Sequence, residues 1–494
     1  MTNNRWIVLA VVSCALLLIV IDMTVLYTAL PRLTHDLHAS ASQKLWIINA
    51  YPLVVAGLLP GTGTLGDRIG HRTMFLCGLI VFGFASTAAA FAPSANFLIG
   101  ARIGLAVGAA MMMPATLSII RITFQDEKER ALALGIWSSI AAGGAAVGPV
   151  VGGVLLEYFW WGSVFLINVP VVIAAFIVGM IVLEKRGGNK ARAWDFIGSV
   201  QIMLALIALT FALKELGKPD RDLLLFAGAL VIGLIAAVMF VKRQNKRTEP
   251  LLDFQLFKNS KFSSGVLTAS VASASLIGVE LVFTQRLQLV AGYSPLQAGL
   301  LILPIPLAAF VAAPLMGFFM NRVGTARALY LSLGMSGVGI VLYLLSYKME
   351  TMIWLLPLMI VGFGVGAAMT GASTAIMGNA SADKAGMAAS IEEVSYELGG
   401  SIGVTVMGSL MTAIYSLNLV LPEFAAQNPA HAKAASDSLD GAKLVAETLP
   451  ADQVSALLDN AYLAFDQSFV VVIAVAAVGV FMTAFGVYRL NKAQ

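Results

Sequence analysis

Two charged residues stand inside long apolar stretches of the sequence, where their chemistry is costly and therefore informative. Asp22 lies within Ile-Val-Ile-Asp-Met-Thr, and Arg102 lies well inside a second apolar stretch. If these stretches cross a bilayer, a charge near the centre costs roughly 2.5–3.5 kcal/mol on insertion scales and is tolerated mainly for function. We predict that Asp22 and Arg102 compensate each other and take part in an ion or proton pathway. A purely structural ion pair is the alternative.

A second group of acids lies near the start of a later apolar stretch. Glu393 and Glu397 are one helical turn apart on a shared face, and Glu392 precedes them. Neighbouring buried carboxylates repel one another, so at least one is expected to hold a proton, which suits a proton carrier or a cation site. The alternative is a water-exposed helix start, where acids suit the helix dipole. Glu280, inside another apolar stretch, is a further candidate carboxylate.

A glycine-rich stretch, residues 142–153, contains the most specific pattern in the chain. Gly144, Gly148 and Gly152 recur every four residues, with Pro149 and Gly153 among them. This spacing predicts a nearly bare helix face that another backbone can approach closely, with a kink at the proline. Ordinary tight packing is the alternative.

Residues 63–72 combine a turn glycine with several charges. Gly63, Asp67, Arg68, Gly70 and Arg72 are predicted to form a loop that joins two apolar segments. A salt bridge here that breaks on opening would bias a two-state equilibrium, whereas the alternative is a fixed turn with positive charges. We predict a gating loop.

Several aromatic residues and a methionine run, residues 111–113, are candidates to line a cavity for flat cations. For any single one, core packing or interfacial anchoring is the competing interpretation. The aromatic candidates are Tyr27, Trp46, Tyr51, Trp137 and Tyr396.

Composition shows what kind of chain carries these residues. The 494 residues are 59% hydrophobic and only 12% charged, and the mean hydropathy is +0.86, so too little polar surface is available for a soluble globule. This excludes soluble enzymes and nucleic-acid-binding proteins. No phosphate-binding Gly-x4-Gly-Lys-Ser/Thr motif occurs, and the four histidines lack metal-ligand spacing. We expect no metal or other cofactor, and an ion gradient as the energy source.

Charged and turn-rich breaks predict an all-α membrane protein with fourteen transmembrane helices. Most Lys and Arg fall in alternate connections, most densely in Lys242–Lys261. The positive-inside rule then places both termini in the cytoplasm and the acidic loop 416–462 outside. The predicted segments are 6–31, 45–65, 73–92, 97–120, 131–155, 163–183, 196–213, 223–241, 263–288, 297–320, 328–346, 352–376, 390–415 and 464–488.

An internal repeat indicates two similar halves in parallel orientation. The pattern Gly63-x3-Asp67-Arg68-x-Gly70 recurs, with Asn321 in the place of the aspartate, at residues 317–324, and Val-Gly-Ala-Ala-Met at 107–111 recurs at 365–369. We predict a six-helix bundle over 1–190, two inserted helices over 191–245, and a second six-helix bundle over 246–494 that includes the external loop. Such repeats usually enclose a substrate site near the bilayer midplane, exposed alternately to each side, which favours transport.

These motifs together resemble the major facilitator superfamily, specifically its fourteen-span drug:proton antiporter branch with QacA-like and SmvA-like exporters. Residues 63–72 resemble its loop 2–3 motif, 143–153 its span 5 antiporter motif, 22–31 its span 1 motif and 392–399 the acidic span 13 segment. The resemblance implies a monomeric antiporter in the inner membrane that exports lipophilic organic cations, such as quaternary ammonium antiseptics and dyes, in exchange for protons. No nucleic-acid partner is expected.

The sequence departs from the family pattern at two places. Leu105-Ala106 replaces the usual Gln-Gly after Arg102, and Asn49 stands where QacA-like relatives can carry an acid. Fewer carboxylates favour a narrower recognition of dications. Two other functions stay open: export of an endogenous metabolite with incidental drug efflux, and a lipid-handling or receptor-like role on the same scaffold.

Overall fold

The computed structural model describes residues 5–185, 188, 194–216, 221–248, 250–349, 352–380 and 385–492. All regular secondary structure in these ranges is helical, and thirteen described segments are long and apolar enough to cross a membrane. The prediction of an all-α, multi-span membrane protein is therefore confirmed. The fifth predicted segment falls on α5, many of whose side chains are outside the described set, so the count of fourteen stays a prediction.

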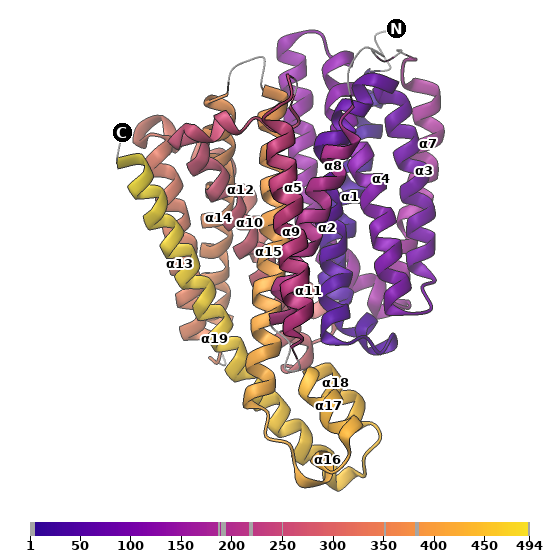
Figure 1. The fold of residues 1–494 in the computed structure, drawn as a ribbon, viewed down its shortest axis with the longest axis vertical. Helices are drawn as coiled ribbons and strands as arrows, with labels where there is room; N and C mark the ends of the chain where they lie inside the picture. Colours follow the sequence, from indigo (N-terminus) through magenta and orange to yellow (C-terminus); the bar gives the residue numbers. More distant parts are fainter. Residues whose placement is uncertain are drawn as a thin grey trace.

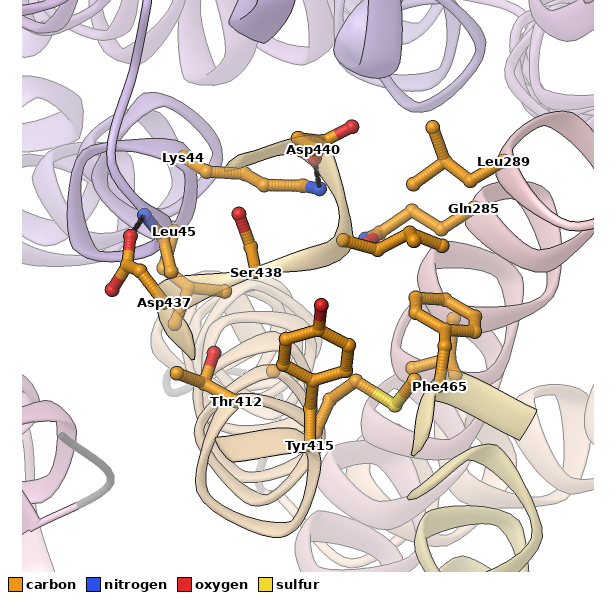
Figure 2. A pocket seen from close by; sticks show the side chains of 15 residues that line it. Lys44, Leu45, Gln285, Leu289, Thr412, Tyr415, Asp437, Ser438, Asp440 and Phe465 are labelled. Carbon is orange, nitrogen blue, oxygen red and sulfur yellow. Dashed lines mark hydrogen bonds and ion pairs between the residues drawn. The ribbon is translucent and has the colours of Figure 1, made fainter. Parts of the chain in front are cut away.

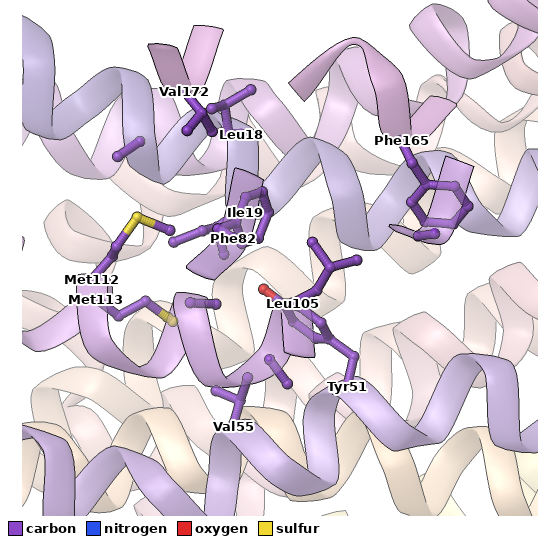
Figure 3. Packing of buried hydrophobic residues seen from close by; sticks show 14 of the residues in the cluster. Leu18, Ile19, Tyr51, Val55, Phe82, Leu105, Met112, Met113, Phe165 and Val172 are labelled. Atoms are coloured by element: carbon purple, nitrogen blue, oxygen red, sulfur yellow. The ribbon is translucent and has the colours of Figure 1, made fainter. Parts of the chain in front are cut away.

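The N-terminal helices form one bundle around an apolar core (Figure 1). Leu18 and Ile19 of the first helix meet Phe82, Leu105 and other apolar side chains of its neighbours in this core (Figure 3). The helices are α1 (Arg5–Asp36), α2 (Ala41–Ile69), α3 (His71–Ala90), α4 (Ala95–Thr123), α5 (Glu127–Tyr158), α6 (Ser163–Leu166) and α7 (Asn168–Val182).

The C-terminal helices enclose a second apolar core, and the two cores meet where Leu281 and Val404 join the N-terminal cluster. The helices are α10 (Ser260–Leu289), α11 (Pro295–Ile302), α12 (Pro304–Val323), α13 (Thr325–Ser346), α14 (Leu355–Gly378), α15 (Ala385–Asn418) and α19 (Ala451–Lys492), with 3-10 turns at Phe254–Lys258 and Met352–Trp354.

Two further helices, α8 (Phe196–Leu216) and α9 (Leu223–Gln244), stand between the bundles in sequence. α8 packs against α2 of the first bundle and α15 of the second. Asp195, just before α8, accepts hydrogen bonds from Arg243 and Gln244 at the end of α9. Burial opposes ionisation of Asp195, but these bonds and the Gly198 N–H outweigh it and lower the pKa. The proposed domain boundaries stay predictions.

Three predicted segments differ from the observed helices. Segment 297–320 is two helices that meet at Leu303, because Pro304 lacks the N–H that would continue α11. Segment 163–183 is likewise divided at Ile167 into α6 and α7. Segment 464–488 is much longer, since α19 begins at Ala451. The predicted loop 416–462 therefore contains the start of α19 and three short helices.

These three helices are α16 (Glu423–Ala426), α17 (Pro429–Asp437) and α18 (Leu439–Ala446). They project beyond the membrane-spanning bundle, at the end opposite both termini (Figure 1). We call residues 423–446 the hairpin subdomain. The position of both termini at one end agrees with an even number of membrane crossings. The side of the membrane that each end faces stays a prediction.

The internal repeat extends to helix caps and turns. Ser40 and Gln43 form a capping box at the start of α2, and Ser294 and Gln297 form the same box at the start of α11. At the far ends of these segments Gly70 and Gly324 have φ values of 97° and 84°, a conformation that glycine adopts at little cost. A one-residue turn therefore joins α2 to α3 and α12 to α13.

Candidate functional site

Asp22 and Arg102 form a buried ion pair inside the first bundle. Arg102 Nη1 on α4 lies 2.6 Å from Asp22 Oδ2 on α1, and their side chains are 2% and 0% exposed. Asn168, the first residue of α7, donates to the other oxygen of Asp22 at 3.1 Å and to Ser86 at 3.2 Å. Three helices thus position one carboxylate, whose charge is balanced by a guanidinium and an amide.

Arg102 connects this pair to the space between the two bundles. Its Nε donates to the Ile47 carbonyl at 3.2 Å, and its guanidinium carbon lies 4.7 Å from the centre of the Tyr51 ring. The stacked ring keeps the planar cation in place by cation–π attraction. Arg102 is therefore the residue that contacts Asp22 on one side and the inter-bundle space on the other.

A small cavity lies where the bundles meet, with about 290 Å³ of space between atoms, part of it open to solvent, and both halves line it. Glu397 of α15 reaches it and is only 7% exposed; among the described residues its Oε2 atom has no hydrogen-bond partner. The Tyr51 hydroxyl is also buried and has none among these residues. The lining residues include Met23, Tyr27, Tyr51, Pro52, Arg102 and Glu397. An unpaired buried carboxylate is costly, so this site suits a proton or a cation.

The other predicted carboxylates lie outside this cavity. α15 begins at Ala385, so Glu392 and Glu393 lie two turns inside the helix and both are half-buried. The interpretation as a water-exposed helix start is therefore wrong. Glu392 accepts a hydrogen bond from the Tyr396 hydroxyl at 3.1 Å. Glu280, on α10, is buried at 8% exposure.

The glycine face of α5 is packed against α1. A Cβ added at Gly144 would contact Leu17 and Val20, and at Gly148 it would overlap the Thr24 hydroxyl. Gly152 lies in the same way against Val25. The predicted close approach of another backbone is thus found, and α5 continues without interruption through Pro149.

The same segment of α5 also touches the opposite bundle. A Cβ at Gly153 would overlap the backbone of Leu296, and one at Gly299 would overlap the Pro149 carbonyl. Both Leu296 and Gly299 belong to α11. The bare face therefore lets α5 lie directly between α1 of its own bundle and α11 of the other.

The predicted gating loop is almost entirely helical, which corrects the expectation of a loop. Residues 63–69 form the last turns of α2, Gly70 is the single turn residue, and Arg72 is in α3. Asp67 Oδ1 lies 3.1 Å from His71 Nε2, and Arg72 donates to the Met180 carbonyl. Arg68 is exposed, and Gly63 lies near Pro114.

The aromatic candidates separate into different environments. Tyr27 and Tyr51 line the cavity. Trp46 instead packs against Lys214, whose Nζ lies 4.3 Å from the centre of the Trp46 ring. Trp137 packs against the first core, and its buried indole N–H has no partner in the part of the chain that the structure describes. Tyr396 is bonded to Glu392.

Three buried polar residues were not identified as site residues from the sequence. Asn168 holds Asp22, as described above. Asn49 on α2 donates to Thr405 at 2.7 Å and accepts from Ser401 at 3.2 Å, which joins it to α15. Lys214, only 4% exposed, donates to the Ser42 carbonyl at 2.8 Å. A single amide or lysine changes the mean hydropathy of its segment too little to be noticed.

Residues 12–404 match the family model described as Major Facilitator Superfamily. The chain belongs to the major facilitator superfamily. Among its relatives in this superfamily, the "Methyl viologen resistance protein SmvA" of Salmonella typhimurium is 37% identical over 99% of both chains. The "Multidrug efflux pump LfrA" of Mycolicibacterium smegmatis is 38% identical over 96% of this chain and 94% of that protein.

A solved superfamily structure has the same fold. It is an inward-facing, occupied bacterial homologue of the human lysosomal transporter Spinster, with a TM-score of 0.69 at 18% identity, over 98% of this chain and 97% of that one. The predicted family and helical architecture are thereby confirmed, and the chain is a membrane transporter of this superfamily.

Proposed function

We propose that this protein is a proton-coupled antiporter that exports lipophilic organic cations by alternating access. It works as a monomer in the cytoplasmic (inner) membrane, with both termini in the cytoplasm, and uses a proton gradient in place of a cofactor. The transport reaction changes no covalent bond, so the protein is not an enzyme.

One observation carries this proposal: the Glu397 carboxylate with its unpartnered oxygen, in a cavity between the two bundles. Tyr27 and Tyr51 supply aromatic surface beside it. A carboxylate next to aromatic rings attracts an organic cation by charge and by cation–π contact, while apolar neighbours favour a lipophilic one. The same carboxylate can hold a proton or a cation, but not both.

Competition for that carboxylate gives exchange in opposite directions. A proton arriving from outside neutralises Glu397 and releases the cation, and loss of the proton to the cytoplasm restores the binding site. Arg102 links Glu397 to Asp22 because it lines the cavity and holds Asp22 at 2.6 Å. Protonation of Asp22 frees the guanidinium to turn toward the cavity, which makes cation binding less favourable.

The glycine contacts of α5 provide the surface for movement. α11 lies on Gly153 and Pro149 with no side chain between the backbones, so the bundles can rock without disengaging bulky side chains. Rocking of two such repeats about a central site is the mechanism that this architecture supports.

The relatives support the substrate class. One is named for resistance to methyl viologen and another as a multidrug efflux pump. Methyl viologen is a flat bis-quaternary dication, which matches a site with a carboxylate and aromatic rings.

Proton release from purified full-length protein tests the proposal directly. Adding tetraphenylphosphonium in weak buffer at a pH where Glu397 is protonated should release about one proton per bound cation, because the two compete for one carboxylate. Glu397→Gln should abolish the release. Glu423→Gln, at an exposed position of α16, is the matched control and should behave as the parent. Cation binding without proton release from the parent would refute proton exchange.

A further inference from the structure

A second, larger cavity lies between the hairpin subdomain and both bundles. It contains about 480 Å³ of space between atoms, part of it open to solvent. Figure 2 shows Lys44, Gln285, Tyr415 and Asp440 converging on it. It is distinct from the Glu397 cavity, because none of the residues lining one lines the other.

An ammonium group already occupies the acidic side of this cavity. Lys44 Nζ on α2 lies 2.5 Å from Asp440 Oδ2 on α18, and the two side chains are only 9% and 6% exposed. Beside them, Asp437 accepts a hydrogen bond from the backbone N–H of Ala41 at 2.7 Å. The site therefore holds one tethered cation, supplied by the opposite bundle.

Lys443 is the other cation close to this group. Its ammonium donates to the Leu289 carbonyl at 2.8 Å, and burial, partly offset by Asp440, lowers its pKa. With Lys44 in place, its ammonium pairs with Asp440. If Lys44 leaves, Asp440 loses this partner, and another cation can take its place.

The remaining wall suits an organic cation better than a hydrated metal ion. Apolar and aromatic side chains form most of it: Leu45, Val282, Leu289, Met411, Tyr415 and Phe465. Gln285 is 8% exposed and points into the cavity (Figure 2); within the described part of the chain its amide has no hydrogen-bond partner. This amide can donate to or accept from a molecule bound in the cavity.

We propose that this cavity is an exit subsite for the exported cation, where the cation displaces Lys44 from Asp440. This inference takes its ligand class from the proposed function. Exchange of one cation for another leaves the charge of the site unchanged, so entry avoids an unpaired buried carboxylate.

Displacement also loosens the connection between the bundles. The hairpin subdomain is held to the N-terminal bundle by Lys44–Asp440 and by Asp437, which accepts a hydrogen bond from Ala41 at the start of α2. Directly after the subdomain, Glu447 Oε1 lies 2.9 Å from His35 Nε2 of α1. Of these contacts only the Lys44 pair is almost fully buried. An arriving cation therefore removes the contact that most firmly closes the exit.

Protection of an engineered thiol tests the subsite. Thr412→Cys, in full-length protein with Cys14→Ser and Cys77→Ser, places a thiol on the cavity wall. In this background Lys44→Gln should let tetraphenylphosphonium protect the thiol from N-ethylmaleimide at a concentration at least about tenfold lower, because a tethered competitor is removed. Adding Asp440→Asn should abolish that protection.

Two controls separate the subsite from other causes. Lys348→Gln removes a lysine that is 68% exposed and pairs with Asp466 at 2.8 Å, and it should leave protection at the parent level. Glu397→Gln combined with Lys44→Gln should keep the protection, because the central cavity is separate. Protection that disappears with Glu397→Gln would be an indirect effect of central binding and would overturn the subsite.

The remaining outcomes are also decisive. Faster thiol labelling in Lys44→Gln without better protection would mean that the pair is only a latch, and the subsite would be wrong. If Lys44→Gln does not fold, Asp440→Asn alone must remove the protection that high tetraphenylphosphonium gives the parent thiol. Proton release by the parent reports on the proposed function independently, so either proposal can fail while the other stands.

Discussion

The Asp22–Arg102 pair gives the sharpest prediction, because removing one partner leaves the other charge buried. Asp22→Asn keeps the size of the side chain and its acceptor oxygen but removes the charge that balances a guanidinium only 2% exposed. Arg102→Gln leaves a carboxylate with no measurable exposure and only Asn168 as donor. Breaking a buried pair in this way costs about 3–5 kcal/mol.

Removing both charges should cost much less than the sum of the two single changes. In Asp22→Asn/Arg102→Gln no unbalanced charge remains. We expect a coupling free energy of about 3 kcal/mol or more between the two positions. The measurement is reversible unfolding in mixed micelles for the four proteins of the cycle.

Dye efflux in the same four proteins separates stability from coupling. The double variant should be folded and still fail to use a pH gradient, because it lacks the Asp22 carboxylate and the Arg102 guanidinium that the proposed coupling needs. Additive losses of stability would refute the ion pair as described. A stable double variant with normal proton-driven efflux would refute the coupling role of Asp22.

Four further predictions concern the other parts of the molecule. Glu397→Gln should abolish proton-driven efflux of both a monovalent and a divalent dye at fixed pH gradient, since the carboxylate for which proton and cation compete is gone; proton-driven efflux of either dye would contradict this. Gly148→Ala should slow efflux by at least about tenfold, because its Cβ overlaps Thr24, whereas Gly100→Ala, with open space around it, should have no effect. Asp67→Asn should slow efflux while changing dye affinity by less than about tenfold, or roughly 1.4 kcal/mol; a larger change in affinity would show a binding role. Impermeant thiol reagents applied outside intact cells should label a cysteine in the hairpin subdomain and not one between α9 and α10, and the reverse would invert the topology.

The sequence predicted the features that are visible as a pattern within a single segment. Asp22 and Arg102 were found because charges inside apolar segments stand out, and the α5 glycines because their four-residue spacing is visible in one helix. The repeat predicted the matching turns at Gly70 and Gly324. Helix ends were less certain, since Pro304 divides a continuous apolar segment that hydropathy alone joins.

Contacts between distant segments could not be predicted in this way. Lys44 and Asp440 each lie near a polar boundary, where charges are ordinary, and only the folded chain brings them to 2.5 Å. Likewise, three neighbouring glutamates look equivalent in the sequence. The rotation of α15 decides that Glu397 reaches the central cavity while Glu392 bonds to Tyr396.

The length of α15 and α19 has a practical consequence. Their 34 and 42 residues span about 50 and 60 Å at 1.5 Å per residue, compared with about 30 Å of hydrocarbon. The extra length carries the hairpin subdomain beyond the lipid. The subdomain is attached to α15 and α19 of the C-terminal bundle and contacts α2 of the N-terminal bundle. On the topology that we predict, an antibody fragment that fastens this projection to α2 would act as an inhibitor from the outside, without having to enter the cell or resemble any exported compound.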